Sequence, residues 1–227
     1  MPERLLLACD AGQLVLAAAV PAGPQVVASG EIAMPATEAF LETAETVVRA
    51  APAGAIVDVW LGSAWMPLLT VDWPSARLDT EEQQALLRVR WSAVLSGLPA
   101  WRLLLAGQAG GRRLSAAVPE ALVSGLRGRL LAAGLRSGHM IPAVCGVLAG
   151  KVTPPAAALA FDEGDRATLL RTDANGVVVD AMSRRRINGE AVAHWLSELG
   201  WRVPVETLGG GRAEGQPACM AWLATWR

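Results

Sequence analysis

The sequence predicts an α/β fold in which mixed β-sheets are flanked by helices, arranged as two halves with a shorter second half. Three observations predict it. Residues 112–150 have the order strand, helix, strand, helix, which is typical of a sheet covered by helices. The chain also opens with three strands followed by a helix, and a second run of strands begins after the Thr-Pro-Pro sequence at residues 153–155.

Composition indicates a folded chain and excludes some classes of protein. With 227 residues, 52% of them hydrophobic, the chain can bury one sizeable core or two small ones. A formal net charge of −1 provides no long-range attraction for nucleic acid. Cys9, Cys145 and Cys219 lie far apart, so neither a metal-binding pair nor a disulfide framework is indicated. A reducing cytoplasm fits best.

The sequence shows no signal peptide and no membrane-spanning run. Leu5–Leu7 are followed at once by Asp10, and no uninterrupted run approaches the roughly 20 apolar residues that a spanning helix needs. We therefore expect a soluble protein, while a membrane segment beyond Arg227 in a longer protein stays open.

The first strands form an antiparallel meander over residues 4–9, 13–20 and 25–32. The triplet Asp10-Ala11-Gly12 and residues 21–24 provide the turns. Apolar residues at helical spacing then predict a helix over Thr37–Arg49. A strand over Ala55–Leu61 follows, and because a helix separates it from the meander, we expect it to lie parallel in the same sheet.

A helix-plus-hairpin subdomain is predicted near residues 75–118, inserted in the first half. A strand over Met66–Trp73 stops at Pro74, and Asp79 or Thr80 begins a helix that runs to Leu95. Two strands over residues 101–106 and 112–118, joined by a glycine-rich loop, then form the hairpin.

The next segment returns the chain to the first sheet. Pro119 and Glu120 begin a helix that Gly134 ends, and three leucines, Leu122, Leu126 and Leu130, share one face of it. Residues 135–141 form a strand and residues 143–149 a short buried helix.

The second half, residues 151–227, repeats the opening pattern in shorter form. Strands are predicted over residues 157–161, 168–171 and 177–181, followed by a helix, a strand and a helix over residues 188–199, 202–207 and 216–226. Its meander also turns at an acidic-x-Gly triplet, Asp162-Glu163-Gly164. The boundary at residue 150 divides the chain into two candidate halves.

This order resembles the actin/hexokinase/heat-shock superfamily, and within it the pilus-assembly protein PilM and the cytoplasmic domain of type II secretion protein L. The resemblance depends on the helix carrying Glu81, Glu82, Arg88 and Trp91 and on SAAVPEALVSGLRGRLLAAGLRSGHMIPAVCGVLAG, residues 115–150. It covers about the first two thirds of the chain. A full PilM-type chain has a much longer second half.

The resemblance implies a nucleotide site between the halves. In the superfamily, one Asp-x-Gly turn from each half holds phosphate and metal, and these match Asp10, Gly12, Asp162 and Gly164. A glycine-rich turn meets the adenosine, and Gly209, Gly210 and Gly211 could supply it. Hydroxyl residues expected after the first turn are replaced by Gln13, Leu14 and Val15, so we expect phosphate to bind poorly. Ordinary hairpin turns explain the same Asp and Gly residues.

Two further groups are candidates for binding a partner. Trp65, Met66, Leu68 and Leu69 form either a partner surface or part of the core. The basic run Arg184, Arg185 and Arg186 is either a solvated loop or a docking site for an acidic partner or anionic lipid. We expect no metal site, since the two histidines, His139 and His194, have no matching ligands or nucleophile in the sequence pattern.

The resemblance implies a non-catalytic scaffold that links the inner-membrane platform of a type IV pilus or type II secretion machine to its assembly ATPase. Such a protein would be cytoplasmic and peripheral to the inner membrane through its partners. The alternative is a small ATP-binding kinase or ATPase, in which Asp10 and Asp162 hold metal and phosphate. Homodimerisation stays open.

Overall fold

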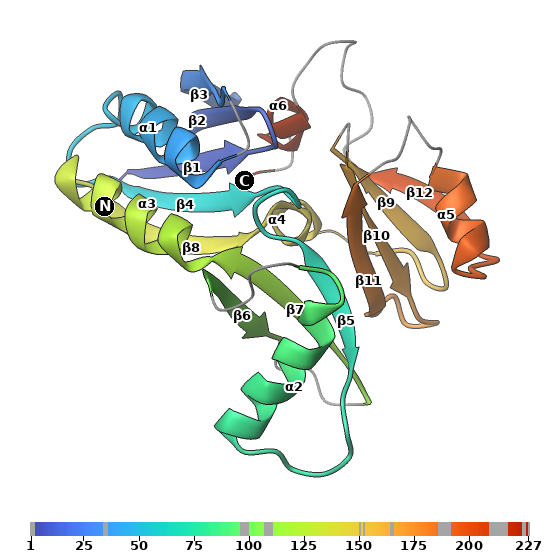
Figure 1. Cartoon of the computed structure of the whole chain (residues 1–227). Helices are drawn as coiled ribbons and strands as arrows, with labels where there is room; N and C mark the ends of the chain where they lie inside the picture. Colours follow the sequence, from blue (N-terminus) through green and yellow to red (C-terminus); the bar gives the residue numbers. More distant parts are fainter. Residues whose placement is uncertain are drawn as a thin grey trace.

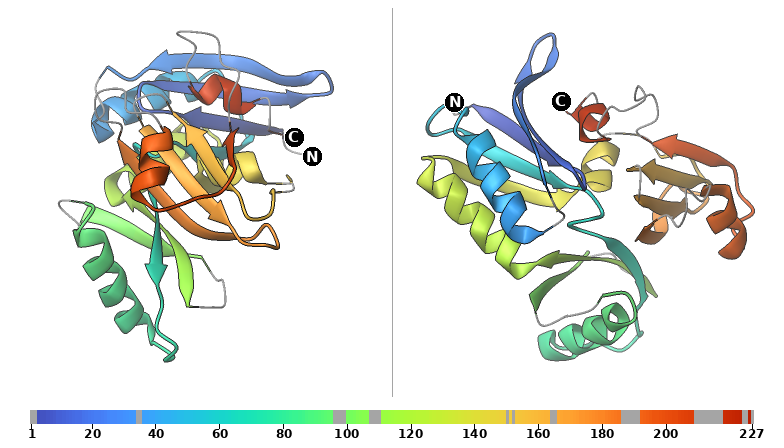
Figure 2. Two further views of the ribbon diagram at one scale, coloured as in Figure 1. Left: turned by 90° about the vertical axis from the view of Figure 1, so that its right-hand side faces the viewer. Right: turned by 45° about the horizontal axis from the view of Figure 1, so that its top comes forward.

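Two mixed β-sheets joined near the centre of the molecule form the framework of the chain (Figure 1). The computed structural model describes residues 3–33, 36–95, 100–106, 111–149, 151, 153–163, 166–185, 192–208, 218–223 and 226. Helices flank both sheets, as the sequence predicts (Figure 2).

The first sheet has five strands in the order β3-β2-β1-β4-β8. They are β1 (Arg4–Cys9), β2 (Gln13–Val20), β3 (Gly23–Glu31), β4 (Ile56–Leu61) and β8 (Arg136–Pro142). The antiparallel meander is confirmed, and both β4 and β8 lie parallel to β1 in this sheet. Helices cross over between the parallel strands, which is the connection expected of such a sheet.

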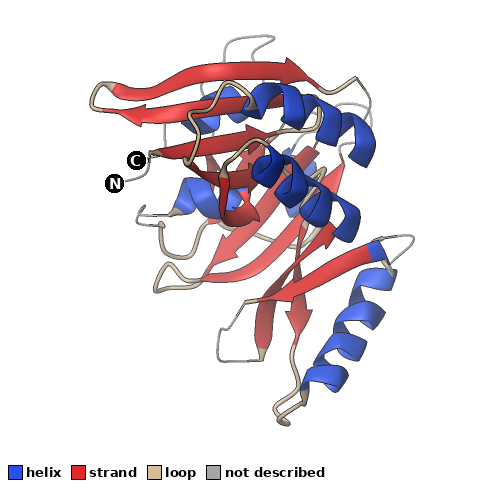
Figure 3. Cartoon of the chain, turned by 90° about the vertical axis from the view of Figure 1, so that its left-hand side faces the viewer, coloured by secondary structure: helices blue, strands red, loops and turns tan. Residues whose placement is uncertain are grey.

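Helices cover both faces of this sheet. The long helices α1 (Thr37–Val48) and α3 (Glu120–Ala132) pack together on one face (Figure 3). The short helices α4 (Ala143–Leu148) and α6 (Ala218–Leu223) lie on the other (Figure 2). Leu122, Leu126 and Leu130 of α3 are buried in the main core, and the positive φ of Gly134, +73°, ends the helix as predicted.

The second sheet has seven strands in the order β12-β9-β10-β11-β5-β7-β6. They are β12 (Val205–Leu208), β9 (Ala158–Asp162), β10 (Arg166–Thr172), β11 (Val178–Arg185), β5 (Leu68–Asp72), β7 (Arg112–Pro119) and β6 (Trp101–Leu105). Strands from the predicted inserted subdomain therefore continue the sheet that the predicted second half begins.

A narrow contact joins these two groups of strands. One residue pair, Leu69 with Met182, connects β5 to β11. Side chains strengthen the join, because Leu68 N donates to Ser183 Oγ at 3.0 Å and Ala181 N donates to Thr70 Oγ1. Sequence patterns report local periodicity and not pairing between distant strands, so this join was not predicted.

Each end of the second sheet has its own helix. Helix α2 (Thr80–Ser92) covers β5–β7, and its Trp91 Nε1 donates to Ser115 Oγ at 2.9 Å. Helix α5 (Val192–Glu198) buries Trp195 and Leu196 in a separate small core with β9 and β10. The predicted division of the chain at residue 150 stays a prediction.

Several elements of the second part differ in extent from the prediction. Strands β10 and β11 are longer, and β12 begins only at Val205, because the preceding Pro204 has no N–H for a ladder. The predicted starts of the last two helices, residues 188–191 and 216–217, lie outside the described residues. No helix in the described part of the chain is long and apolar enough to cross a membrane.

Candidate functional site

The candidate site lies where the turn after β1, the turn after β4, the end of β9 and helix α6 meet. Asp10 stands at its centre and is 7% exposed. One carboxylate oxygen, Oδ1, accepts hydrogen bonds from Gly12 N at 2.9 Å and Gln13 N at 2.8 Å. The other, Oδ2, accepts one from Cys219 N at 3.2 Å. The carboxylate thus holds its own turn and the start of α6.

Glu163 approaches the same place from the second sheet. Its Oε1 accepts a hydrogen bond at 2.7 Å from the backbone N–H of Ser63, one hundred residues away. The other oxygen, Oε2, is buried and has no hydrogen-bond partner among the described residues, and the same holds for Ser63 Oγ. Burial, reinforced by the nearby charge of Asp10, raises the pKa of Glu163 to about 7, although the bond from Ser63 and the charge of Arg166 oppose the shift.

Gly62 makes this close approach possible. A Cβ atom at this position would lie 2.6 Å from Glu163 Oε1 and 3.0 Å from the backbone oxygen of Cys9. Gly62 N also donates to Cys9 O at 2.7 Å, which fixes the turn after β4 against the end of β1. A side chain here would push the two sheets apart.

Helix α6 closes the site from a distant part of the sequence. It contacts β1 and β2, while the ring of its Trp222 lies 5.1 Å from that of Phe161 in β9. Cys219 and Trp222 are buried. The last helix therefore packs against both sheets and covers Asp10.

The predicted nucleotide residues are only partly brought together. Asp10 and Gly12 form the first turn, and Gly12 is exposed. Asp162 is half-buried at the end of β9, but its neighbour Glu163 is the residue that faces Asp10. Gly164, Gly209, Gly210 and Gly211 lie outside the described residues.

Glu163 is the residue that sequence reasoning missed. The sequence does contain a pattern that places Glu163, because successive side chains along an extended chain point to opposite sides. Glu163 directly follows Asp162, the last residue of β9, and so points to the other side. The acidic triplet alone did not say which carboxylate would face the first turn.

Trp65, Met66 and Leu68 correct one of the two interpretations offered for them. They are 4%, 2% and 5% exposed, so in this structure they belong to the core and are not an exposed partner surface. The indole of Trp65 donates to Asp10 O at 2.8 Å and meets Phe40 edge-on at 4.9 Å. The segment is buried because it connects the two sheets.

The basic run is partly engaged within the protein. Arg184 forms an ion pair of 2.8 Å with Glu198, and its guanidinium lies 4.4 Å from the centre of the Trp195 ring. Arg185 is exposed, and Arg186 lies outside the described residues. Docking of an acidic partner or anionic lipid here stays a prediction.

The described residues do not fit Mg-ATP as they are arranged. Both oxygens of Asp10 already accept backbone N–H groups. A phosphate near Ser63 N would have to displace a buried carboxylate that occupies this donor. Leu14 and Val15, which replace the expected hydroxyl residues, are fully buried. The geometry instead serves to hold the two sheets and α6 together.

Comparisons of sequence find nothing: no family model matches the chain, and no curated protein matches it. Solved structures do match. The cytoplasmic domain of EpsL, an inner-membrane component of the type II secretion system of Vibrio cholerae, is 17% identical with a TM-score of 0.57, covering 97% of this chain and 92% of that one.

Two further structures agree with this match. A chain of the PilM-PilN type IV pilus biogenesis complex is 16% identical with a TM-score of 0.54, and the match spans 81% of this chain but only 61% of that one. A Bacteroides thetaiotaomicron protein with an actin-like ATPase fold and unknown function is 9% identical with a TM-score of 0.62, covering 93% and 84%. The chain therefore has the actin-like fold, with an architecture like that of PilM and of the EpsL cytoplasmic domain.

Proposed function

We propose that the chain is a non-catalytic, actin-like adaptor of a type II secretion or type IV pilus machine. It would link an inner-membrane platform protein to the assembly ATPase and act at the cytoplasmic face of the inner membrane. This role is the one that the resemblance to PilM and secretion protein L implies.

The observation that carries the proposal is the state of the site between the sheets. An actin-like ATPase needs acidic oxygens and backbone N–H groups free to receive metal and phosphate. Here Asp10 accepts three backbone N–H groups of its own chain, and Glu163 occupies Ser63 N. Such an arrangement favours a rigid scaffold over nucleotide turnover.

Likeness of fold supports the choice of machine. Among the matched structures, EpsL is described as an inner-membrane component of a secretion system and PilM as part of a pilus biogenesis complex. Because a shared fold does not by itself define function, binding must be measured directly.

The test is binding of the purified chain to two purified proteins encoded in the same genome. One is the cytoplasmic tail of the inner-membrane platform protein, and the other is the assembly ATPase. The proposal expects saturable binding of both by calorimetry, including at the same time. Absence of binding to either protein, with a folded chain confirmed by circular dichroism, would contradict it. Turnover of ATP by the chain alone would favour the kinase or ATPase alternative.

A further inference from the structure

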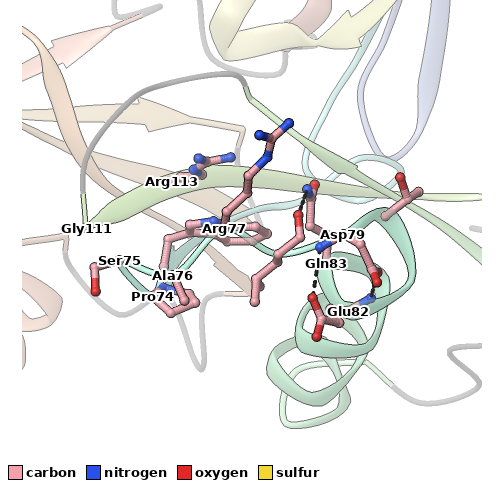
Figure 4. A pocket seen from close by; sticks show the side chains of 12 residues that line it. Pro74, Ser75, Ala76, Arg77, Asp79, Glu82, Gln83, Gly111 and Arg113 are labelled. Carbon is pink, nitrogen blue, oxygen red and sulfur yellow. Dashed lines mark hydrogen bonds between the residues drawn. The ribbon is translucent and has the colours of Figure 1, made fainter.

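A pocket of about 1080 Å³ lies at the tip of the α2 subdomain, between the first turn of α2 and the ends of β5 and β7 (Figure 4). This end of the subdomain is the one farthest from the five-stranded sheet (Figure 1). The pocket is therefore separate from the site around Asp10. Its volume is slightly above the roughly 300–1,000 Å³ typical of ligand sites.

Two arginines give the pocket its chemical character. Arg77, from the loop before α2, and Arg113, from β7, line it together. Figure 4 shows both guanidinium groups on the side opposite Glu82. Within the described residues neither has an acidic partner, and the buried Nε of Arg113 has no hydrogen-bond acceptor. An unsatisfied guanidinium donor is costly, so it favours an added acceptor.

Aromatic and apolar surface adjoins these charges. The guanidinium carbon of Arg113 lies 4.6 Å from the centre of the Trp73 ring, and Trp73 is buried. Pro74 and Leu78 also line the pocket. A stacked arginine is held flat and keeps its N–H fork free for a carboxylate. Arginine is one of the residue types enriched among those that dominate protein–protein binding energy.

The acidic residues of the pocket are already used by the helix. Asp79 Oδ1 accepts from Glu81 N and Glu82 N at 2.9 Å each, and Glu82 Oε2 accepts from Asp79 N at 2.9 Å. This capping box satisfies the first N–H groups of α2. The first N–H groups of α2 are thus satisfied within the protein, and Arg77 and Arg113 are the cationic donors that line the pocket.

We infer that this pocket binds an acidic peptide segment of a partner protein. Carboxylates of the segment would pair with Arg77 and Arg113, and an aliphatic side chain would pack on Pro74 and Leu78. The volume accommodates several peptide residues. The inference does not depend on which machine the chain serves, because it is argued from charge and shape at this pocket alone.

Nitrogen-15 NMR of the whole chain tests it, with the indole N–H signal of Trp73 and the Nε–H signal of Arg113 as reporters. The probe is the peptide acetyl-Leu-Asp-Leu-Asp-Leu-amide. The controls are the same peptide with lysine in place of aspartate, and inorganic phosphate. We expect the acidic peptide to shift both signals in a saturable way, and the two controls to bind at least about tenfold more weakly.

Variants separate a specific site from general attraction. R77Q removes an exposed side chain and should weaken the acidic peptide about tenfold or more, with R113Q at least as damaging. R88Q removes an exposed arginine of α2 that does not line the pocket. The affinity of this variant for the acidic peptide should therefore stay within about twofold of the wild-type value. If R113Q unfolds, R77Q alone decides. Equal binding of the lysine peptide or of phosphate, no shift of the reporters, or equal effects of R77Q and R88Q would overturn the inference.

Discussion

Replacement of Glu163 by glutamine should change how the free energy of unfolding depends on pH. In the folded chain, burial is the main reason that the pKa of Glu163 rises from an ordinary value of 4.5 to about 7. In the unfolded chain the carboxyl is in water and has its ordinary pKa. The folded state therefore holds this proton over a range of pH in which the unfolded state has lost it.

The sign follows from this difference in proton binding. Below pH 4.5 both states are protonated and Glu163 contributes its full stability. Between pH 4.5 and 7 the folded state binds more protons, so stability falls as pH rises, and above about pH 7 the loss is complete. The interval between the two values corresponds to about 3 kcal/mol.

Glutamine keeps an oxygen for the N–H of Ser63 but has no proton to lose. The stability of E163Q relative to wild type should therefore rise by about 3 kcal/mol between pH 4.5 and 8. Urea unfolding at a series of pH values measures it, with E206Q, a change at an exposed residue of β12, as the control. If the unfolding free energies of E163Q and wild type change equally with pH over this range, Glu163 is not buried against Ser63 as the structure places it.

Three further substitutions test the packing, each by urea unfolding. Gly62→Ala places a Cβ atom 2.6 Å from a buried carboxylate oxygen and should cost about 1–3 kcal/mol of unfolding free energy. Gly12→Ala is the control and should cost less, because a Cβ atom there has no atom within 4 Å. Equal losses for the two variants would count against the close approach of Glu163 to Gly62. Asp79→Ala removes the side-chain half of the α2 capping box, the acceptor for Glu81 N and Glu82 N, and should cost about 0.5–2 kcal/mol. An unchanged midpoint would mean that the cap does not form. Leu126→Ala should cost about 2–5 kcal/mol because the side chain of Leu126 is fully buried. Leu131 is 76% exposed, so Leu131→Ala should cost about 0.5 kcal/mol or less. The reverse order of losses would mean that α3 buries a different face.

Elements with strong local signals were predictable from the sequence. Helix α3 has a proline at its start, leucines on one face and a glycine after its end, and the structure has that helix with those leucines buried. The parallel placement of β4 followed from the crossover helix before it. These predictions depended on spacing within one element or between neighbours.

The candidate site was harder to predict because distant segments build it. Asp10 was identified, but its bond to Cys219 joins residues 209 positions apart, and no local pattern encodes such a contact. Glu163 was missed in favour of Asp162, since the turn residue that faces inward depends on where β9 ends. Trp65, Met66 and Leu68 had the composition of either a core or a partner surface, and only the position of the second sheet decides between them.

Thermal unfolding of the chain with and without Mg-ATP tests the central claim most directly. The account predicts no change in Tm with nucleotide, because Asp10 and Ser63 N are already occupied within the protein. A functional site would stabilise the fold by about 2.7 kcal/mol at a nucleotide concentration one hundred times Kd. A clear rise in Tm that Asp10→Ala and Asp162→Ala both abolish would contradict the adaptor account and favour an ATP-binding enzyme.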